Sequence, residues 1–567
     1  MAAKLFDRLK ETGLFSDAQI EDLLASYRAE GGSITELVTK QGLAREEVFL
    51  PALAKAMGVP FIRLQDQQIE RPVLDKLPTK AVFQYSILPL ALENDMLRIA
   101  THDPFRPGLV DALRLASGLR IRFTLASHED LIKAIKQFYG VGAETVDQMM
   151  QDDTGETFED DLLSKDISEL DQDASIVKFV NQIIWEAHQD RATDIHLEPM
   201  ETDLRIRYRV DGVLLQTPVP QQLKRFQSAI ISRIKVMSNM DIAEKRLPQD
   251  GRISVRIRGE EIDVRVSTMP TVYGESVSLR LLMRSSGLFG MDKLGLEPPD
   301  QEILHKLIQR PHGILLVTGP TGSGKSTSLY TWLHEINTID QRILTVEEPI
   351  EYEMPGINQI QMRPEIGLTF AVGLRHILRQ DPDVIMVGEI RDKETAEIAI
   401  RAALTGHLVF STLHTNDAPG AITRLVDMGI EPFLVASSVE AIVAQRLVRR
   451  LCPKCKRPWK VDEKFLNSIS FPLERLPEGT IMEAVGCEEC RRTGFRGRTG
   501  IYEILVVHDT MRQLVVQRAT AGDIKAHALR HGMRTLRIDG WTKVLHGVST
   551  LEEVLRVSEE DEALTET

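Results

Sequence analysis

Residues 319–327 read Gly319-Pro320-Thr321-Gly322-Ser323-Gly324-Lys325-Ser326-Thr327 and match the phosphate-binding pattern G-x-x-x-x-G-K-[ST] at every fixed position. The apolar run 314–317 before them predicts a buried strand, and residues 328–333 after them predict a helix. In such a loop, backbone N–H groups turn toward phosphate oxygens, and the helix N-terminus adds partial positive charge. We therefore predict that the loop binds a nucleoside triphosphate, with Lys325 on the β- and γ-phosphates and the Ser326 hydroxyl on Mg²⁺. A glycine turn without a ligand is the less favoured alternative.

The composition is that of a soluble globular protein. The chain has 567 residues, of which 43% are hydrophobic and 27% are charged. This length predicts about three to five domains. No apolar stretch approaches the roughly 20 residues that a membrane-spanning helix needs, and the N-terminus lacks a signal-peptide core. We therefore expect the protein to stay on the cytoplasmic side, with only peripheral membrane contact.

The net charge of −14 comes mainly from one segment. Between Glu144 and Asp173 there are twelve acidic residues and a single basic one, Lys165. Like charges repel and extend a chain, so this segment is predicted to be a flexible linker. The rest of the chain is close to neutral. The charge therefore does not indicate nucleic acid as a partner.

The pattern of predicted elements divides the chain into six parts. The first part mixes helices and strands, and the part after the linker has strands with one apolar face and one row of arginines. A solvated sheet face is the simplest interpretation of most of these arginines. Beyond it, strands and helices alternate with short connections, which predicts a parallel sheet. We predict an N-terminal docking domain (1–140), an acidic linker (141–174), a second N-terminal α/β domain (175–288), a P-loop core (289–450), a tetracysteine module (451–500) and a C-terminal helical region (501–567).

Polar residues flank three further predicted strands of the core. These buried strands and the one before the P-loop span 314–318, 343–346, 384–387 and 408–412. Glu347 and Glu348 follow one of them, Glu389 follows the next, and His407 and His414 flank the last. The carboxyl ends of parallel strands meet at one crevice, where a carboxylate can hold Mg²⁺ or orient the attacking water. Taken singly, each glutamate or histidine is as compatible with a structural role.

Three segments resemble motifs of one protein family. Residues 343–351 resemble the acidic box of the type II/type IV secretion ATPase superfamily, 381–392 its Walker B region, and 405–416 its histidine box. The resemblance is strongest to the type II secretion ATPases and covers residues 175–557. It implies an α/β fold with a RecA-like P-loop ATPase core, preceded by an α/β arginine-bearing domain and a mixed α/β N-terminal domain.

The same resemblance implies roles for individual residues. Glu347 would be the water-activating carboxylate, Glu389 the Walker B residue near Mg²⁺, and His414 a catalytic histidine. Arginines of the preceding domain and of the core would lie near the phosphates; these are Arg265, Arg280, Arg375, Arg379 and Arg391. One position departs from the family, which usually has Asp where this chain has Glu348. The longer side chain is expected to shift local hydrogen bonds.

The four cysteines form two C-x-x-C pairs. Cys452 and Cys455 make one pair, and Cys487 and Cys490 make the other. Two such pairs suit tetrahedral, structural Zn²⁺, and members of the resembled family carry such an insertion. Two disulfides are the alternative, which the cytosol disfavours. The basic cluster 449–457 has no interleaved aromatic residues, so a protein or membrane surface is a better partner for it than nucleic acid.

The resemblance implies a cytoplasmic ATPase that assembles as a homohexamer. It would drive pseudopilus assembly and protein secretion, using ATP, Mg²⁺ and Zn²⁺, with inner-membrane platform and anchoring proteins as partners and no nucleic acid. A type IV pilus assembly ATPase shares every motif and is the nearest alternative. A nucleic-acid motor and a nucleotide-sensing module without turnover are the others. The sequence also leaves open whether the N-terminal domain binds a regulatory ligand such as cyclic di-GMP.

Overall fold

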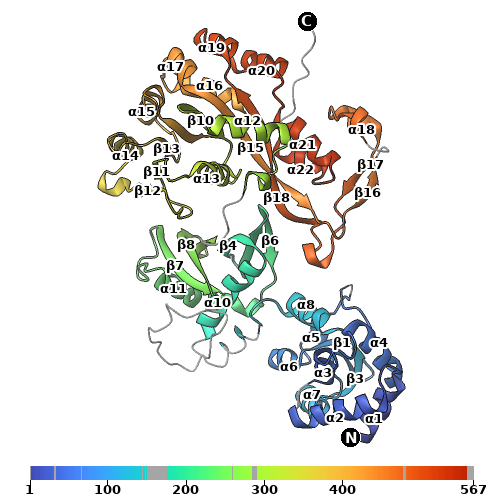
Figure 1. Cartoon of the computed structure of the whole chain (residues 1–567). Helices are drawn as coiled ribbons and strands as arrows, with labels where there is room; N and C mark the ends of the chain where they lie inside the picture. The colour runs from blue at the N-terminus through green and yellow to red at the C-terminus, as the bar shows by residue number, and fades with distance from the viewer. Residues whose placement is uncertain are drawn as a thin grey trace. The chain divides into compact units, whose positions relative to one another are not determined.

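A computed structural model of the chain describes residues 2–30, 33–65, 67–143, 145–146, 149, 175–257, 259–283, 290–476 and 480–558. Most of the predicted acidic linker lies outside these residues. The chain divides into two compact units, Met1–Met283 and Arg284–Thr567, which are described one at a time (Figure 1). No helix in the described ranges combines the length and apolar content that crossing a bilayer requires.

The first part of unit one has a small three-stranded sheet with helices around it. Strands β1 (Ile87–Glu93) and β2 (Met96–Thr101) are antiparallel, and β2 pairs in parallel with β3 (Arg120–Leu125). The mixture of helices and strands predicted for this part is confirmed. Its helices are α1 (Ala2–Glu11), α2 (Asp17–Glu30), α3 (Ile34–Lys40), α4 (Glu46–Met57), α5 (Arg71–Leu74), α6 (Thr79–Tyr85), α7 (Leu109–Ser117) and α8 (His128–Tyr139).

The second part of unit one is a six-stranded antiparallel sheet in the order β6-β5-β4-β9-β8-β7. The apolar face of this sheet packs against two helices of the same part, α10 and α11. Their shared core also takes in Val141, Val146 and Met149. The chain therefore already packs against this sheet at the start of the predicted linker. The elements are α10 (Ser175–Gln189), β4 (Ala192–Pro199), β5 (Leu204–Val210), β6 (Val213–Thr217), α11 (Gln227–Met237), β7 (Gln249–Ile257), β8 (Glu260–Thr271) and β9 (Gly274–Met283).

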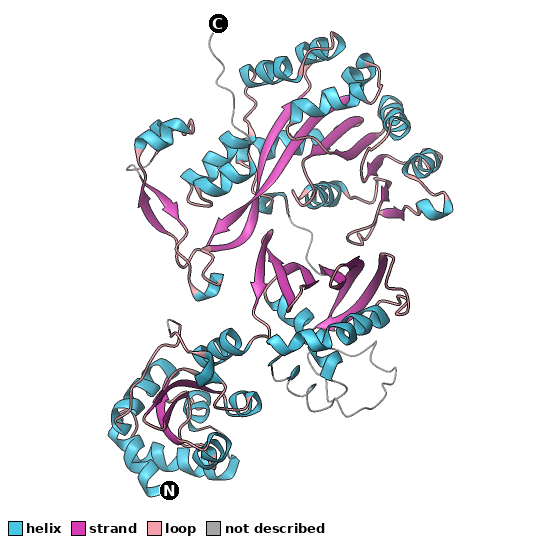
Figure 2. Cartoon of the chain, turned by 180° about the vertical axis from the view of Figure 1, so that it is seen from behind, coloured by secondary structure: helices cyan, strands magenta, loops and turns pink. Residues whose placement is uncertain are grey.

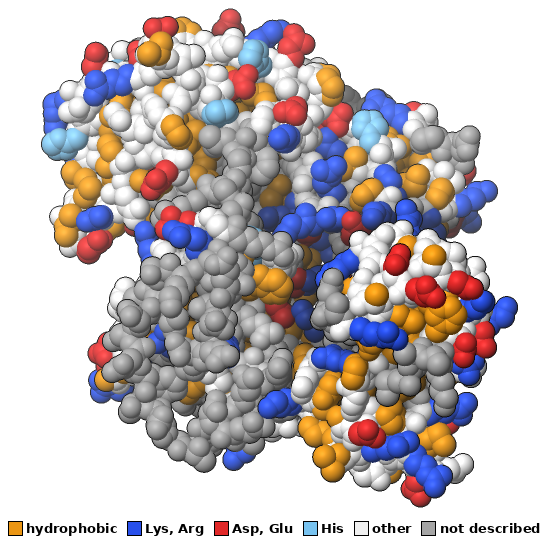
Figure 3. Space-filling model, turned by 60° about the horizontal axis from the view of Figure 1, so that its bottom comes forward, with side chains coloured by type: hydrophobic (Ala, Val, Ile, Leu, Met, Phe, Trp, Pro, Cys, Tyr) orange, Lys and Arg blue, Asp and Glu red, His pale blue; other side chains and the backbone are white. Residues whose placement is uncertain are grey.

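Strand β5 shows how the arginine row arises. Leu204, Ile206 and Tyr208 are buried, and the arginines between them lie on the other face, as the two-residue period of a strand requires. Two of these arginines, Arg205 and Arg207, form ion pairs with Glu198 of β4. Acidic and basic side chains are both scattered over the face of the molecule that Figure 3 presents. These two arginines are thus ion-paired across the sheet.

Unit two is built on a seven-stranded sheet in the order β12-β11-β13-β14-β10-β15-β18. All pairs are parallel except β15 with β18, and the predicted parallel core sheet is confirmed. The four predicted strands correspond to the first four of the following. The strands are β10 (Gly313–Thr318), β11 (Ile343–Glu347), β13 (Val384–Val387), β14 (Leu408–Leu413), β12 (Asn358–Gln361), β15 (Val439–Leu451) and β18 (Phe495–Val506).

Helices cover both faces of this sheet (Figure 2). In β10, Ile314 and Leu316 belong to one core and Leu315 and Val317 to another, so both faces are buried. Leu315 and Val317 pack with α12 (Pro298–Ile308) and α13 (Lys325–Ile336). The opposite core takes in α14 (Phe370–Ile377), α15 (Lys393–Leu404), α16 (Ala418–Asp427) and α17 (Pro432–Ser438).

The core sheet extends past the boundary that the sequence predicted. Residues 495–506 form β18, which pairs with β15 from Ala441 opposite Val506 to Leu451 opposite Phe495. The start of the predicted C-terminal helical region is therefore a strand, whose buried apolar residues Ile501, Tyr502, Ile504 and Leu505 help to complete the sheet. Only after it do helices follow: α19 (Asp509–Val516), α20 (Ala521–Arg530), α21 (Leu536–Leu545) and α22 (Leu551–Val557). The cysteine segment, with β16 (Arg457–Lys460), α18 (Glu463–Ser468) and β17 (Thr480–Glu483), is inserted between β15 and β18.

Candidate functional site

The P-loop connects β10 to α13 and needs glycine at three positions. Gly322 and Gly324 have φ angles of +79° and +92°, a region that L side chains rarely adopt. A Cβ atom on Gly319 would lie 2.6 Å from the backbone oxygen of Gln445, and one on Gly324 would lie 2.8 Å from the Nε2 atom of the same residue. The loop is thus closely packed against β15 and could not form with larger residues.

Two polar groups of the loop fit a phosphate ligand. The Ser323 hydroxyl oxygen is buried and has no hydrogen-bond partner among the described residues. The Lys325 ammonium donates to the carbonyl oxygens of Gly319 at 2.7 Å and Pro320 at 3.1 Å. Burial lowers the pKa of Lys325 to about 8, opposed by the nearby carboxylate of Glu389. An anion in the loop would satisfy both groups, since it would accept hydrogen bonds and stabilise the charged ammonium.

Glu389 gathers three basic side chains at the carboxyl edge of the sheet. It lies two residues beyond β13, and its carboxylate is 2.5 Å from Nη2 of Arg391 and 3.4 Å from Nε2 of His414, which follows β14. Its charge also raises the pKa of Lys325. The structure therefore brings together Lys325, Glu389, Arg391 and His414, as a site for a bound anion and a metal ion requires.

Glu347 ends β11 and is held by three hydrogen bonds. Its carboxylate accepts from the hydroxyl of Tyr330, from Oγ1 of Thr345 at 2.5 Å and from Nε2 of Gln359 at 3.1 Å. The residue is only 4% exposed. Burial raises the pKa of Glu347, and the three hydrogen bonds oppose this shift. A carboxylate with a raised pKa is a stronger base, which suits proton acceptance from water.

The other core arginines and Glu348 lie in different surroundings. Arg375 on α14 forms an ion pair with Glu394, and Arg379 donates to the backbone oxygen of Arg375 at 3.0 Å. Glu348 lies 4.0 Å from Arg391. Of the three core arginines predicted near the phosphates, Arg391 is therefore the one whose side chain contacts a member of the Lys325–Glu389 group.

Arg265 and Arg280 belong to unit one, where they face each other on neighbouring strands. They are cross-strand partners of β8 and β9. Arg280 donates from Nε to Oδ1 of Asp194 at 3.0 Å, and its side chain is 56% exposed. Like charges directly opposite each other are unfavourable, and the carboxylate of Asp194 offsets this repulsion. Their contact with phosphate stays a prediction.

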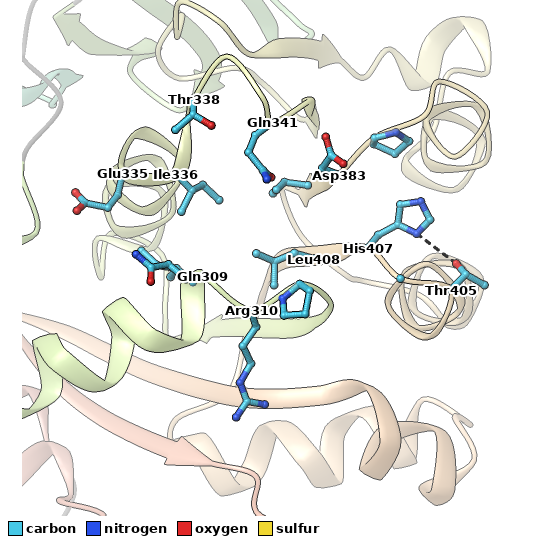
Figure 4. Close-up of a pocket in the computed structure, with 15 residues that line it drawn as sticks. Gln309, Arg310, Glu335, Ile336, Thr338, Gln341, Asp383, Thr405, His407 and Leu408 are labelled. Atoms are coloured by element: carbon cyan, nitrogen blue, oxygen red, sulfur yellow. Dashed lines mark hydrogen bonds between the residues drawn. The ribbon is translucent and has the colours of Figure 1, made fainter.

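His407 lies at the wrong end of its strand for the predicted crevice. It precedes β14, whereas the P-loop follows β10, a parallel neighbour. Its Nδ1 atom is 2.9 Å from the backbone oxygen of Ala402, so it is held by the end of α15. Figure 4 shows His407 beside a different cavity of about 590 Å³, lined by Arg310 and Asp383 among others. His407 and His414 therefore lie at opposite ends of β14, because this six-residue strand separates them.

Two residues of β15 that border the P-loop are not among the predicted site residues. Gln445 is 2% exposed and accepts a hydrogen bond from the Ser328 hydroxyl at 2.8 Å. Arg446 donates to the backbone oxygen of Asn416 at 2.7 Å, and its charge lowers the pKa of Lys325. The apolar run 441–444 before them is a signal for a strand and could have indicated this position.

The four cysteines lie together between β15 and β18. Their sulfur atoms all lie within 4.8 Å of one another, and Cys452–Cys487 and Cys455–Cys490 are each 3.8 Å apart. A disulfide requires about 2.05 Å, so the alternative of two disulfides is absent from this structure. Sulfur atoms bound tetrahedrally at Zn–S distances of about 2.3 Å are about 3.8 Å apart. Burial raises the pKa of Cys455 to about 12; it would also raise that of Cys490, but the N–H groups of Cys487 and Gly494 lower that pKa to about 7. The cluster fits a thiolate-bound metal ion.

Comparisons with known proteins agree with this geometry. Residues 169–556 match the family described as "Type II/IV secretion system protein", and residues 57–145 match the MshEN domain. The type IV pilus assembly ATPase PilB of Myxococcus xanthus is 42% identical over 560 residues, which are 98% of this chain and 99% of that protein. The type II secretion system protein E of Xanthomonas campestris is 43% identical over 560 residues, or 98% and 97%. The solved ATPase DotB of Yersinia pseudotuberculosis, at 20% identity and a TM-score of 0.50 over 71% of this chain and 98% of that one, shares the fold.

Proposed function

Because this chain belongs to the Type II/IV secretion system protein family, we propose that it is the ATPase that drives pseudopilus assembly and protein export in a type II secretion system. The membership confirms the resemblance that the three motif segments indicate. One observation carries the catalytic part of the proposal. Lys325 of the P-loop and Glu389 beyond β13 interact at the carboxyl edge of the core sheet, where a Mg²⁺-bound triphosphate needs them.

The proposed roles follow from charge and position. Loop N–H groups and Lys325 would hold the phosphates, the exposed Ser326 hydroxyl and Glu389 would hold Mg²⁺, and Glu347 would accept a proton from the attacking water. Bound ATP supplies the phosphoryl group that is transferred to water. The four cysteines would hold one Zn²⁺ in a closed, structural site.

The proposed setting follows from the family resemblance. We expect a homohexamer at the cytoplasmic face of the inner membrane, docked on platform and anchoring proteins of the secretion system. Arg265 and Arg280 would complete the nucleotide site in the assembled ring. The 451–500 module and its basic residues are candidates for the docking surface.

The enzymatic part is tested by phosphate release from the purified full chain with ATP and Mg²⁺. Steady-state release supports the ATPase, and binding without release would favour a nucleotide-sensing module. Stimulation by added DNA or RNA would favour the nucleic-acid motor instead.

Assembly of type IV pili is a second candidate function. It is favoured by the pilus ATPase of Myxococcus xanthus, which matches this chain over as many residues, 560, and at nearly the same identity as the secretion protein. Deletion of the gene in its host separates the two. Loss of secreted proteins with pili intact supports secretion, and loss of pili with secretion intact supports pilus assembly.

A further inference from the structure

Three histidines form a second cluster in unit two, apart from the cysteines. His508 lies between β18 and α19, His527 lies on α20, and His531 follows the end of that helix. A ring nitrogen from each lies within 4.8 Å of those of the other two. The ring centroids are 4.2 to 5.4 Å apart. The four-residue spacing puts His527 and His531 on one helix face, where both can reach His508.

Hydrogen bonds orient two of the three rings as in metal sites. The Nδ1 atom of His508 is 3.1 Å from the backbone oxygen of Val506, and that of His531 is 2.9 Å from the backbone oxygen of His527. A carbonyl oxygen only accepts, so both rings carry their proton on Nδ1 and leave a lone pair on Nε2. Histidine ligands of metal ions almost always donate their other N–H in this way.

The free lone pair on Nε2 of His508 also points to a ligand. Its Nε2 atom is buried and has no hydrogen-bond partner in the described part of the chain. A buried nitrogen without a partner costs free energy that a bound ion would recover. The third ring, His527, has Oγ1 of Thr510 at 3.0 Å from its Nε2 atom as a hydrogen-bond partner.

The surroundings tolerate a cation. The cluster lies at the C-terminal end of α20, where the helix dipole favours positive charge. Two arginines flank His531 in the sequence. Arg534 forms an ion pair with Asp300, whereas Arg530 donates to the backbone oxygen of Ala526. Burial, the other two histidines and the charge of Arg530 together lower the pKa of His527. A cavity of about 250 Å³ borders His508 and His531, with room for water as a further ligand.

We propose that His508, His527 and His531 bind one divalent transition-metal ion such as Zn²⁺, independently of the four cysteines. Imidazole is a preferred ligand of such ions. Nitrogens bound tetrahedrally at Zn–N distances of about 2.0–2.1 Å are about 3.3 Å apart, so small side-chain rotations bring the three into place. The ion would tie the segment after β18 to α20 and leave a coordination position for water.

The test counts metal ions in the full chain. Equilibrium dialysis against buffered free Zn²⁺ compares the wild type with His531→Gln and with His508→Gln, which lies on a different segment. His546→Gln is the matched control, because His546 is an exposed histidine that follows α21 in the same part of the chain. We expect both cluster variants to bind one equivalent fewer than the wild type, and His546→Gln to lose none.

Equal stoichiometry in the wild type and in a folded cluster variant would overturn the proposal. So would the same loss in His546→Gln. Cobalt(II) titration separates the two sites, because only thiolate ligands give a sulfur-to-cobalt charge-transfer band. That band should persist in His531→Gln, which also reports that the cysteine module is intact. If one cluster variant fails to fold, the other supplies the count.

Discussion

The hydroxyl of Tyr330 donates a hydrogen bond to the carboxylate of Glu347. Tyr330 lies on α13, the helix that begins at Lys325. Glu347 ends β11, and strands β13 and β14 lie between β11 and β10, the strand that precedes the P-loop. The helix that presents the phosphate-binding lysine thus also holds the proposed base. Movement of α13 on nucleotide binding would therefore alter the hydrogen bond between Tyr330 and Glu347.

Replacement of Tyr330 by Phe is expected to change the pH dependence of hydrolysis. The hydrogen bond from Tyr330 lowers the pKa of Glu347, so its loss should raise that pKa. A protonated Glu347 cannot accept a proton, and the acidic limb of the kcat profile should move to higher pH. At neutral pH we expect a loss of roughly 2- to 10-fold, well below the 10²–10⁴-fold contribution of a general base itself, because the base is retained. The measurement is phosphate release at saturating ATP across pH.

Tyr352→Phe is the control for this prediction, because its ring packs edge-on against Tyr330 at 5.7 Å without contacting the carboxylate. An unshifted acidic limb in Tyr330→Phe, or an equal shift in both variants, would contradict the proposed role of Glu347.

Glu553 on α22 is expected to stabilise unit two in a pH-dependent way. It is 2% exposed; burial would raise its pKa, but hydrogen bonds from Arg449 and Arg556 lower it to about 2. The pKa of a glutamate in the unfolded chain is about 4.3. The stabilisation is therefore present above that pH and is lost as the pH falls toward 2. Glu553→Gln should lower the free energy of unfolding at pH 7 by about 2–3 kcal/mol.

Chemical denaturation of the wild type, of Glu553→Gln and of a control variant, Glu552→Gln, at pH 7 and pH 3 measures this effect. The exposed neighbour Glu552→Gln should stay within about 0.5 kcal/mol of the wild type. The difference between wild type and Glu553→Gln should shrink at the lower pH. A difference that is the same at both pH values would argue against the ion pairs as its source.

The cysteine module is expected to depend on its metal. Cys452→Ser removes one of four ligands and should weaken the thiolate–cobalt band and lower the metal content, because three thiolates bind the ion less tightly than four. The thermal unfolding temperature should also fall, since metal binding contributes to folding of the module. Metal analysis and cobalt spectroscopy check this. Retention of the thiolate-bound equivalent would show that Cys452 is not a ligand.

Activity is expected to depend on assembly through Arg280. If its exposed guanidinium reaches phosphates in the ring, Arg280→Ala should lower kcat by up to about 10³-fold and change ATP affinity far less. Specific activity of the wild type should rise with protein concentration as rings form. Arg256→Ala, an exposed arginine of β7 in the same sheet, should retain activity. Normal turnover in Arg280→Ala, at a rate independent of concentration, would mean that Arg280 only solvates the sheet face.

Part of this architecture could be predicted from the sequence, for physical reasons. Strands β10, β11, β13 and β14 are buried on both faces, so each is mostly apolar without the alternating polar face of an amphipathic helix. The P-loop and the cysteine pairs are local patterns whose chemistry fixes their geometry. The order of strands is set by long-range pairing, and this is why the place of β18 in the core sheet was missed.

The candidate site was predictable to the same extent. Glu389 and His414 follow their strands, so the direction of the strands puts both at the carboxyl edge of the sheet, where Glu389 contacts His414 and its charge acts on Lys325. His407 precedes its strand and was wrongly grouped with them. Gln445 and Arg446 contact the P-loop through the pairing of β15 with β10, which leaves no mark at either position alone.

The most direct test of the account is the rate of phosphate release by Lys325→Ala. The variant lacks the charge that the P-loop directs at the β- and γ-phosphates. We expect at least about a 100-fold loss, as for other preorganised charges in phosphoryl transfer, with an unchanged thermal unfolding temperature. Lys393→Ala, an exposed lysine that begins α15, should hydrolyse ATP at the wild-type rate. Near-normal release by folded Lys325→Ala would contradict the assignment of this loop as the catalytic site.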